Sequence, residues 1–492
     1  MYNASMRFYV ETFGCQMNVA DSLEMARRLR ARGYRATPDM DRADVVLVNT
    51  CTVRDHAEHK ALSFLGRLAD WKELVPGRRI VFAGCAAERL KDQLQRRFPQ
   101  VDAVVGAKSI SDFDRLLDEQ GTVPLFDGNV VAQVPHPPLR GTFPQEGKEN
   151  NLLDERGTVP LFDGKKEWTD AWGWSAGLGP SGLPGEGATA YITIMRGCNF
   201  GCTYCVVPSV RGRELYRPAL SILDEAAERV ANGQREVLLL GQTVNSYRPV
   251  GSNPGRDGKD IRHFSDLLEA VSALPGIERV RYMSPHPHYI DELFAERLGR
   301  LPQVPPHIHL PVQSGSDAVL SRMRRNYTRD DFCRKLDLLR RHVPGLAVTT
   351  DFIVGFPGET DDDFEASLRL GREADLDGAY IFKYSPRPGT ASAQGPDDVS
   401  DALKEERLAR LMAETDSRSR AKMAAWVGQT QTILVEAVRP EGDGFELEGR
   451  TAHCRKMYVS SRRSAAVGAT LEARVDRADG KTLYGTALDD RV

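Results

Sequence analysis

The chain of 492 residues has no long hydrophobic run. No apolar stretch approaches the roughly 18 residues that a membrane-spanning helix needs. The opening residues, MYNASMRFYVETFGCQMN, also lack the basic region and apolar stretch of a secretory signal. With 41% hydrophobic and 27% charged residues, the composition is that of a globular protein. These features predict a soluble, cytoplasmic protein with no membrane association.

A strong net charge is also absent, since 66 basic and 69 acidic residues leave a net charge of −3. Bulk charge therefore does not indicate a polyanionic partner, and nucleic-acid binding would have to come from local basic patches. Solvated helix faces produce arginine runs as often as phosphate-binding sites do. Two groups of arginines are candidates: Arg211, Arg213 and Arg217, and Arg322, Arg324 and Arg325.

Cysteine is scarce, with eight residues in the whole chain. Thiols stay reduced in the cytoplasm, so these cysteines are expected to be metal ligands or catalytic thiols and not disulfides. Six of them follow predicted strands in two groups of three. Cys333 and Cys454 have no companions at ligand spacing, and we expect both to be buried structural thiols.

Strand and helix patterns alternate over residues 5–118, which predicts an α/β domain built on a doubly wound, mainly parallel sheet. One helix is expected to begin at Asp21, because Asp21 and Glu24 have the spacing of a capping box. Residues 119–187 are rich in glycine, proline and charge and indicate a linker or insertion. This region carries a short duplication, LLDEQGTVPLFDGN and LLDERGTVPLFDGK, with no chemistry attached.

Two further domains are expected after this linker. Six strand-helix units over residues 184–420 predict a partial TIM-like (β/α) barrel, whose active site would lie at the carboxyl ends of its strands. Short alternating runs over residues 423–488 predict a small C-terminal β-barrel. Some barrels of this kind bind oligonucleotides, although the fold alone does not establish that function.

The first cysteine group is RGCNFGCTYC, a C-x3-C-x2-C motif formed by Cys198, Cys202 and Cys205 after a strand. Three thiolates can hold three irons of a 4Fe-4S cluster and leave the fourth iron without a protein ligand. A structural zinc site is the alternative. Zinc normally takes four protein ligands, and no nearby residue completes such a set.

The second group is Cys15, Cys51 and Cys85, each of which directly follows a predicted strand. Strand carboxyl ends meet at one edge of a doubly wound sheet, so three cysteines distant in sequence can come together there. They could hold a second cluster that also has one open iron. The alternative is three ordinary cysteines buried in the core.

The C-x3-C-x2-C motif, with Tyr204 before its third cysteine, resembles the signature of the radical S-adenosylmethionine superfamily. In that superfamily the open iron chelates the methionine moiety of S-adenosylmethionine, and one-electron reduction releases a 5′-deoxyadenosyl radical. Both cysteine groups together resemble the methylthiotransferase family. The branch that converts N6-isopentenyladenosine next to the tRNA anticodon to its 2-methylthio form is most similar, on these motifs: GCQMNVADS, NTCTVRDHAE, GQTVNSY, SPHPH, HIHLPVQSGS, MRRNYTRDDF and DFIVGFPGET.

The resemblance implies two 4Fe-4S clusters and S-adenosylmethionine as both methyl donor and radical source. Cys198, Cys202 and Cys205 would hold the catalytic cluster, and a second set would hold the auxiliary cluster that presents sulfur: Cys15, Cys51 and Cys85. The implied partners are tRNA, a reductant protein of the flavodoxin or ferredoxin type and a sulfur donor, with the enzyme acting as a monomer. The terminal segment resembles the TRAM domain, an RNA-binding module of this family.

The resemblance also suggests cofactor contacts at the ends of predicted strands. They are Gln242, Gln313, Ser314, Gly355, Gly358 and Glu359. The glycines could instead form only the turn before a helix capped by Thr360. The histidine pairs His286 and His288, and His307 and His309, are interpreted as polar faces of strands in preference to metal ligands.

Some positions depart from the expected family pattern. Ser209 and Val210 replace Tyr and Thr, and Thr243 replaces Asn, which weakens the assignment of the substrate but not of the enzyme class. One alternative is a sister methylthiotransferase that acts on threonylcarbamoyladenosine or a ribosomal protein, although NVADS and VNSY argue against it. Another is a metal-stabilised RNA-binding protein without catalytic activity.

Overall fold

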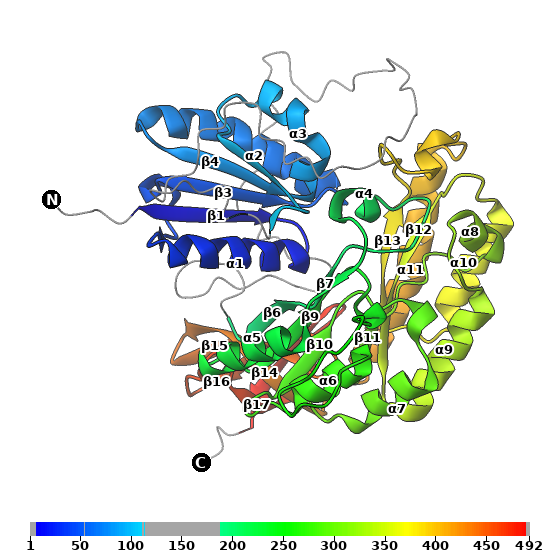
Figure 1. The fold of residues 1–492 in the computed structure, drawn as a ribbon. Helices are drawn as coiled ribbons and strands as arrows, with labels where there is room; N and C mark the ends of the chain where they lie inside the picture. The colour runs from blue at the N-terminus through cyan, green and yellow to red at the C-terminus, as the bar shows by residue number, and fades with distance from the viewer. Residues whose placement is uncertain (1–5, 54, 111–112, 114–186, 489–492) are drawn as a thin grey trace. The chain divides into compact units, whose positions relative to one another are not determined.

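The computed structural model describes residues 6–53, 55–110, 113 and 187–488 (Figure 1). The chain divides into two compact units: unit 1 contains Met1–Phe13 and Met25–Thr169, and unit 2 contains Gly14–Glu24 and Asp170–Val492. The duplicated segments and almost all of the expected linker, residues 119–187, lie outside the described residues. Among the residues described, no helix combines the length and apolar character needed to cross a membrane.

Unit 1 is built on a five-stranded sheet in the order β2-β1-β3-β4-β5, and every neighbouring pair is parallel. Its central strand β3, VVLVNT, is buried along its whole length, as expected for a parallel strand covered on both faces. The predicted parallel α/β architecture is confirmed here. The strands are β1 (Arg7–Phe13), β2 (Arg35–Ala36), β3 (Val45–Thr50), β4 (Arg79–Gly84) and β5 (Ala103–Gly106).

Helices pack against the apolar residues of this sheet. Val48 and Phe82 from the strands contact Leu65 and Leu68 in one cluster of buried side chains. The helical segments are α1 (Gln16–Ala31), η1 (Met40–Arg42), α2 (Asp55–Leu74) and α3 (Cys85–Arg97). The predicted start of α1 at Asp21 is wrong, because the helix begins five residues earlier and Asp21 is completely buried. A buried carboxylate inside a helix cannot act as its cap.

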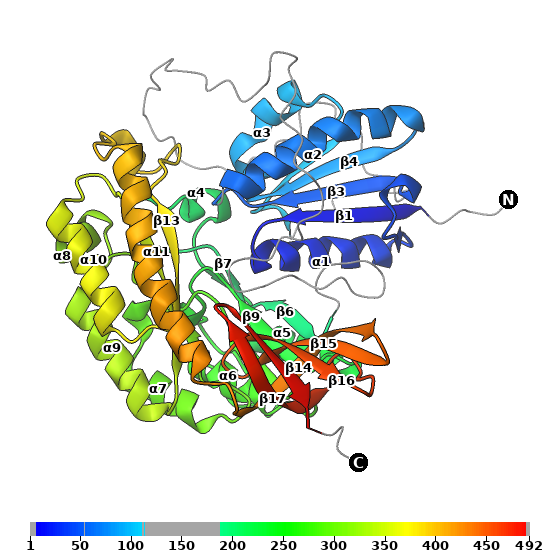
Figure 2. The same ribbon diagram turned by 180° about the vertical axis from the view of Figure 1, so that it is seen from behind.

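The central part of unit 2 contains two three-stranded parallel sheets, β10-β9-β6 and β11-β12-β13. One continuous hydrophobic cluster underlies both sheets. Figures 1 and 2 show α9 and α10 on the outside of these strands. The predicted mixed α/β class with parallel sheets is thus confirmed. The strands are β6 (Thr189–Thr193), β7 (Met195–Arg196), β8 (Leu215–Tyr216), β9 (Glu236–Leu240), β10 (Arg279–Tyr282), β11 (His307–His309), β12 (Ala347–Val354) and β13 (Gly378–Lys383).

Several helices of this part, among them α7 to α11, begin at a residue whose side chain caps the first turn. Thr360 accepts a hydrogen bond from the backbone N–H of Asp363 and forms a capping box with it, which confirms the predicted cap of α10. The helical segments are α4 (Val207–Arg211), α5 (Ala219–Ala231), η3 (Val244–Ser246), α6 (Phe264–Ser272), η4 (Pro287–Tyr289), α7 (Glu292–Arg300), α8 (Asp317–Arg322), α9 (Arg329–His342), α10 (Asp361–Glu373), η5 (Ser392–Gln394) and α11 (Asp401–Ala424).

The last five strands close into a barrel in the order β14-β15-β16-β18-β17. Its interior holds Ile433, Val435, Leu447 and Val459. The strands are β14 (Thr430–Glu441), β15 (Gly444–Thr451), β16 (Lys456–Ser461), β17 (Thr470–Asp479) and β18 (Thr482–Ala487). Only the pair β16-β18 is parallel among the pairs of this barrel.

Buried charges join the barrel to the sheets within unit 2. Arg281 of β10 donates to the Sγ atom of Cys454 at 2.6 Å and forms an ion pair with Glu236 at 3.0 Å. Cys454 is buried as predicted, whereas Cys333 is only half-buried. Arg281 also donates to the carbonyl of Thr451 at 3.3 Å, so two hydrogen bonds from one buried side chain connect the barrel to β10.

Candidate functional site

The C-x3-C-x2-C motif lies on the segment between β7 and β8, which pair with each other as a short antiparallel ribbon. The thiols of Cys198, Cys202 and Cys205 are all half-buried. The backbone N–H of Cys198 donates to the carbonyl of Gly212 at 3.1 Å, and that of Cys205 donates to the carbonyl of Cys202 at 3.1 Å. The ribbon and these bonds hold both ends of the cysteine loop, defined as residues 197–205.

A glycine is required at the start of this loop. Gly197 has φ of +81°, and a Cβ atom there would lie 2.1 Å from the carbonyl oxygen of Arg213. Its backbone N–H donates to the side-chain oxygen of Gln242 at 2.6 Å. Gln242, expected from the sequence to contact a cofactor, therefore supports the residue before the first cysteine.

One departure from the family pattern lies directly against the loop. The Oγ1 atom of Thr243 is 3.4 Å from the Sγ atom of Cys198. Val210 is buried, and the hydroxyl of Ser209 donates to the carbonyl of Val206 at 2.7 Å. Of these three departures, Thr243 is the one with a side-chain contact to a motif cysteine among the described residues.

The surroundings of the loop disfavour isolated thiolates. The pKa of Cys205 is raised to about 12, mainly by burial and in part by the nearby Cys202 and Cys198, while a backbone hydrogen bond acts in the opposite direction. Burial also raises the pKa of Cys198, while the hydrogen bond from Thr243 lowers it. The three thiols thus share one electrostatic environment, in which a bound cation would favour their ionised form.

Three thiols on one loop are a donor set that fits three irons of an iron-sulfur cluster. In the described ranges, no three side chains of His, Cys, Asp or Glu converge as ligands of one metal ion. Zinc needs its ligands around one centre, whereas the thiolates of a 4Fe-4S cluster each bind a different iron and stand further apart. Cys198, Cys202 and Cys205 could therefore hold three irons of such a cluster.

Phe200, one of the two aromatic residues inside the motif, packs on the SPHPH segment. The ring of Phe200 stacks on His286 with centroids 4.0 Å apart, and His286 also contacts the edge of Tyr327. Burial lowers the pKa of His286 to about 2, with smaller effects of Arg325 and His288, so its imidazole is neutral. Its Nδ1 atom accepts from the backbone N–H of His288 at 3.2 Å.

The interpretation of the histidine pairs holds for one pair only. His307 and His309 lie in β11, where Nε2 of His309 is 3.3 Å from Asp351. The strand interpretation is wrong for the other pair: His286 immediately precedes the 3-10 turn η4, and His288 lies within it. Proline on each side of His286 favours this turn over a continued strand.

Two of the expected cofactor contacts follow β11. Gln313 has φ of +78°, which is rare for a residue other than glycine and often marks a functional site. Its backbone N–H donates to the carbonyl of Asp351 at 2.8 Å, and its carbonyl accepts from Ile353 at 2.9 Å. Ser314 is buried, with its Oγ atom 3.3 Å from that of Ser367. The carboxyl end of β11 thus has a fixed and strained backbone.

The remaining expected contacts lie in the turn after β12. The Oε1 atom of Glu359 accepts from the backbone N–H of Gly355 at 3.0 Å and from Arg407 of α11 at 2.9 Å. Burial raises the pKa of Glu359, whereas the bonds from Gly355 and Arg407 lower it. Gly355 has φ of +69°, and a Cβ atom there would lie 2.3 Å from Cγ of Lys404. Glu359 therefore anchors this turn to α11, and Gly358 shares the positive φ of the turn.

The second cysteine group follows neighbouring strands of the unit 1 sheet. Cys51 comes directly after β3 and Cys85 directly after β4, and both are buried. The backbone N–H of Cys51 donates to the carbonyl of Phe13, the last residue of β1, at 2.9 Å. Cys15 follows β1 by two residues, is half-buried and belongs to unit 2. Its Sγ atom donates to Asn18 at 3.4 Å.

Sequence reasoning missed a buried ion pair beside the cysteine loop, within unit 2. Asp21 is completely buried and forms ion pairs with Arg196, the residue before Gly197, and with Arg211, the last residue of α4. The distance between Asp21 Oδ2 and Arg211 Nη2 is 2.8 Å. One carboxylate thus connects both flanks of the loop. Asp21 is 175 residues from Arg196 and 190 from Arg211 along the chain, so no local sequence pattern could indicate these ion pairs.

Fewer of the six candidate arginines are available for phosphate contacts than the sequence suggested. The prediction is wrong for Arg211, which is buried, and Arg325 is half-buried against the cysteine loop. Arg217 forms an ion pair with Glu225, and Arg322 with Asp363. Two of the six side chains are exposed and have no side-chain partner among the described residues: Arg213 and Arg324.

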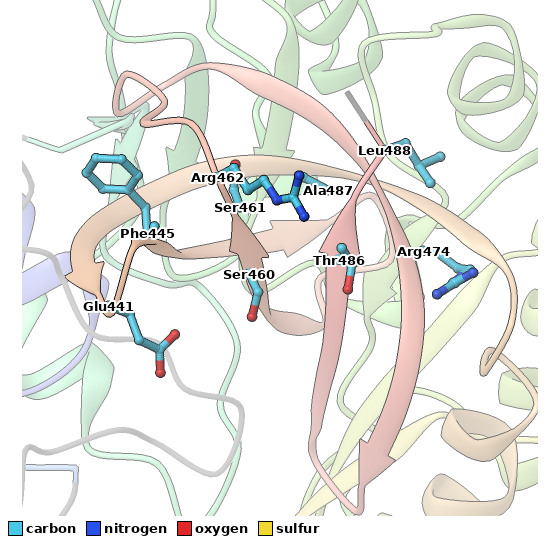
Figure 3. A pocket seen from close by; sticks show the side chains of 10 residues that line it. Glu441, Phe445, Ser460, Ser461, Arg462, Arg474, Thr486, Ala487 and Leu488 are labelled. Carbon is cyan, nitrogen blue, oxygen red and sulfur yellow. The ribbon is translucent and has the colours of Figure 1, made fainter. Parts of the chain in front are cut away.

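A separate hollow of about 660 Å³ lies on the C-terminal barrel (Figure 3). Arg462, Arg474 and Phe445 line it together with three hydroxyl side chains: Ser460, Ser461 and Thr486. The Nε atom of Arg474 is 3.0 Å from Asp476. The hollow contains none of the residues expected to be catalytic. Its lining is polar and carries both signs of charge, because Glu441 lines it as well as the two arginines (Figure 3).

Comparison with known proteins agrees with the chemistry of the cysteine loop. The model of the radical SAM superfamily matches residues 192–371, and that of an uncharacterized protein family, UPF0004, matches residues 7–106. A solved structure of TsrM from Kitasatospora setae, a radical S-adenosylmethionine methyltransferase, has a TM-score of 0.54 at 15% identity and covers 85% of this chain and 90% of that chain. This similarity supports the fold alone. Fold and site together define a radical SAM enzyme.

Curated relatives extend over nearly the whole chain. The tRNA-2-methylthio-N(6)-dimethylallyladenosine synthase of Sorangium cellulosum is 39% identical over 97% of this chain and 92% of its own length. The enzymes of the same name from Anaeromyxobacter dehalogenans and Moorella thermoacetica are 38% and 36% identical, over 98% and 99% of this chain and 94% and 100% of their own lengths. The chain belongs to the tRNA-2-methylthio-N(6)-dimethylallyladenosine synthase family.

Proposed function

We propose that this enzyme adds a 2-methylthio group to N6-isopentenyladenosine next to the anticodon of tRNA. The observation that carries the proposal is the cysteine loop, on which three half-buried thiols share one electrostatic environment. The near full-length relationship to synthases of that name supports this substrate class.

In this proposal Cys198, Cys202 and Cys205 are the ligands of the catalytic 4Fe-4S cluster. When bound, the cluster and S-adenosylmethionine supply the radical and the methyl group of the reaction. The chain supplies the position of the ligands through the bond from Gly197 to Gln242. Phe200, stacked on the neutral ring of His286, covers one side of the loop with apolar surface.

Cys15, Cys51 and Cys85 are proposed as ligands of the auxiliary 4Fe-4S cluster that presents sulfur. The support is that they follow β1, β3 and β4, which are neighbours in one parallel sheet. Carboxyl ends of such strands are the usual location of ligand sites in open α/β sheets.

For S-adenosylmethionine, we propose Gln313 and Ser314 at the end of β11 and Gly355 in the turn after β12 as backbone and side-chain contacts. Positive φ at Gln313 supports this assignment, because strained backbone at a residue other than glycine concentrates at binding sites. Gln242 and Glu359 remain part of the proposed site, but their present bonds give them the role of holding the loop and the turn.

The proposed domains are an auxiliary-cluster domain at residues 5–118, a linker at residues 119–187, a radical SAM core at residues 184–420 and a TRAM-like barrel at residues 423–488. The core is interpreted as a partial TIM-like barrel formed by its two parallel sheets. The hollow on the C-terminal barrel is proposed to contact tRNA, because arginine binds phosphate and Phe445 offers a ring on which a base can stack.

The proposed reaction requires partners besides tRNA. One is a reductant protein of the flavodoxin or ferredoxin type, and another is a sulfur donor that restores the auxiliary site. We propose that the enzyme works as a monomer in the cytoplasm, where its tRNA substrate is found.

Nucleoside mass spectrometry of tRNA from cells with and without this gene tests the function. We expect the 2-methylthio derivative of isopentenyladenosine to disappear from the deletion strain and to return with the wild-type gene. Normal levels in the deletion strain would refute the proposal. Loss of a methylthiolated threonylcarbamoyladenosine instead would identify the sister activity.

Two cysteine variants test the division of roles in the purified enzyme. Cys202→Ala should abolish the reductive cleavage of S-adenosylmethionine to 5′-deoxyadenosine, a reaction that a non-catalytic RNA-binding protein cannot perform. Cys51→Ala should retain part of that cleavage and lose the methylthio product. Equal loss of both activities in a folded Cys51→Ala protein would contradict the separate roles.

A further inference from the structure

Arg325, from the MRRNYTRDDF motif, lies against the cysteine loop. It is half-buried in the segment between α8 and α9, and its Nη1 atom is 3.5 Å from the Sγ atom of Cys202. The guanidinium is therefore within contact distance of a thiol that the proposed function assigns to the catalytic cluster. A surface arginine of a solvated helix face would have no such contact.

Other bonds fix the direction of this guanidinium. Nε of Arg325 donates to the hydroxyl of Tyr327 at 2.7 Å, and Nη2 donates to the carbonyl of Pro311 at 3.2 Å. The hydroxyl of Tyr327 donates in turn to the carbonyl of Val312 at 2.9 Å. Because Nε and Nη2 are engaged elsewhere, the planar fork directs Nη1 towards Cys202.

Among the residues that the structure describes, the charge of Arg325 has no carboxylate partner. In the part of the chain that the structure describes, no Asp or Glu side chain forms an ion pair with it, whereas Arg322 pairs with Asp363 and Arg329 with Glu373. A guanidinium stays protonated at any ordinary pH, so Arg325 is charged. A cation partly withdrawn from water needs an anion, and a thiolate-bound cluster would supply it.

We propose that Arg325 is a positioning residue that donates an N–H bond to the Cys202 thiolate and raises the reduction potential of the cluster on this loop. The inference rests on the proposed function. A one-electron reduction adds negative charge, which a nearby cation and an N–H bond to sulfur stabilise. The electron comes from the external reductant, and Arg325 neither gains nor loses a proton.

The competing interpretation is a purely structural role, in which Arg325 only connects the α8–α9 segment to the segment after β11 by its hydrogen bonds to Tyr327 and Pro311. Loss of a purely structural residue would affect the folding of the segment and the amount of bound iron. It would not change the potential of a cluster that has been fully loaded. The potential is therefore the measurement that separates the two roles.

The experiment uses the full-length chain with Cys15, Cys51 and Cys85 changed to alanine, so that one cluster is titrated. After anaerobic reconstitution and iron analysis, the potential is measured by dithionite titration followed by electron paramagnetic resonance. Arg325→Gln should shift the potential to more negative values. Arg324→Gln removes an exposed neighbouring charge that has no side-chain partner among the described residues, and it should cause no comparable shift.

Two further variants refine the test. Arg325→Lys keeps the charge but loses the planar fork, so its potential should lie between those of the parent protein and Arg325→Gln. Tyr327→Phe keeps the charge and removes the group that orients it, and it should shift the potential in the same direction by a smaller amount. A fully loaded Arg325→Gln protein with the potential of the Arg324→Gln control would overturn the inference.

The remaining outcomes are also decisive. If Arg325→Gln binds no iron, Arg325→Lys and Tyr327→Phe carry the comparison, and unchanged potentials in both refute the role in tuning. If the parent protein binds no cluster that depends on Cys202, the proposed function itself fails. The failure of the proposed function is thus distinguishable from the failure of the inference.

Discussion

The side-chain oxygen of Gln242 accepts the backbone N–H of Gly197 at 2.6 Å, and this bond connects two neighbouring strands at the cysteine loop. Gln242 follows β9, which pairs in parallel with β6, and Gly197 lies after β6 and β7. The position of Cys198 is therefore set by an adjacent strand as well as by its own. A loop that holds three cluster ligands gains from such support, because ligands that are already positioned lose less entropy on binding.

Gly197→Ala is expected to damage this loop. The added Cβ would meet the carbonyl of Arg213, and the positive φ is unfavourable for alanine, so the protein should lose more than about 1 kcal/mol of stability. The iron bound at Cys198, Cys202 and Cys205 should fall with it. Chemical denaturation of the apoprotein and iron analysis after reconstitution measure the two effects.

Gly201→Ala is the matched control, because Gly201 lies in the same loop and a Cβ atom there would have no neighbour within 4 Å. We expect a stability change within about 0.5 kcal/mol and normal iron content. A loss of stability in Gly197→Ala as small as that in Gly201→Ala would show that the conformation at Gly197 is unimportant.

Asp21→Asn should destabilise unit 2. The substitution leaves Arg196 and Arg211 without their shared anion, and breaking a buried pair in this way costs about 3–5 kcal/mol. Asp224→Asn is the control, because Asp224 is exposed in its pair with Arg256 and should change stability by no more than about 1 kcal/mol. Denaturant unfolding of both variants at pH 7 measures the difference, and similar values for both would contradict the importance of burial.

The contribution of Asp21 should also depend on pH in a defined direction. Burial alone would raise the pKa of Asp21, but the ion pairs with Arg196 and Arg211 lower it below its ordinary value. A lowered pKa in the folded state gives stability that is fully present above the unfolded pKa of about 3.9 and is lost as the pH falls through the folded value. The difference in unfolding free energy between wild type and Asp21→Asn should be constant from about pH 5 to 8 and shrink below about pH 4. A difference that varied between pH 5 and 8 would assign the effect to another group.

Local patterns in the sequence were sufficient for the coarse fold. Alternating strands and helices predicted the parallel sheets, and the buried run VVLVNT forms the central strand of the first sheet. The cap at Thr360 was predicted correctly because capping depends on residues three positions apart. Turn chemistry explains the error at SPHPH, where the prolines on either side of His286 favour the 3-10 turn η4 over a strand.

Contacts between distant residues could not be predicted in the same way. Asp21 and Arg211 are 190 positions apart, and the spacing of Asp21 to Glu24 suggested a helix cap. Arg325 is 123 positions from Cys202 and lies in a basic run that also fits a solvated surface. In each case the sequence shows a charge, but the partner depends on the tertiary packing of separate segments.

The residues that line the hollow on the C-terminal barrel are expected to contribute to tRNA affinity. Arg462→Ala and Arg474→Ala should each weaken binding and reduce the salt dependence of the association constant by about one unit of slope, as expected for the loss of one phosphate contact. Phe445→Ala should weaken binding by about 1–3 kcal/mol through lost stacking and leave the salt slope unchanged. Fluorescence anisotropy with labelled tRNA at several salt concentrations measures both quantities.

Arg256→Ala is the control for this series, because Arg256 is an exposed arginine that pairs with Asp224 and does not line the barrel hollow. Its salt slope should equal that of the wild type. If all three arginine variants behave alike, the effect comes from net charge and not from the hollow. If Phe445→Ala changes the salt slope as the arginine variants do, the ring does not stack on a base but supports a neighbouring cation. In that case tRNA would contact this face through its phosphates alone.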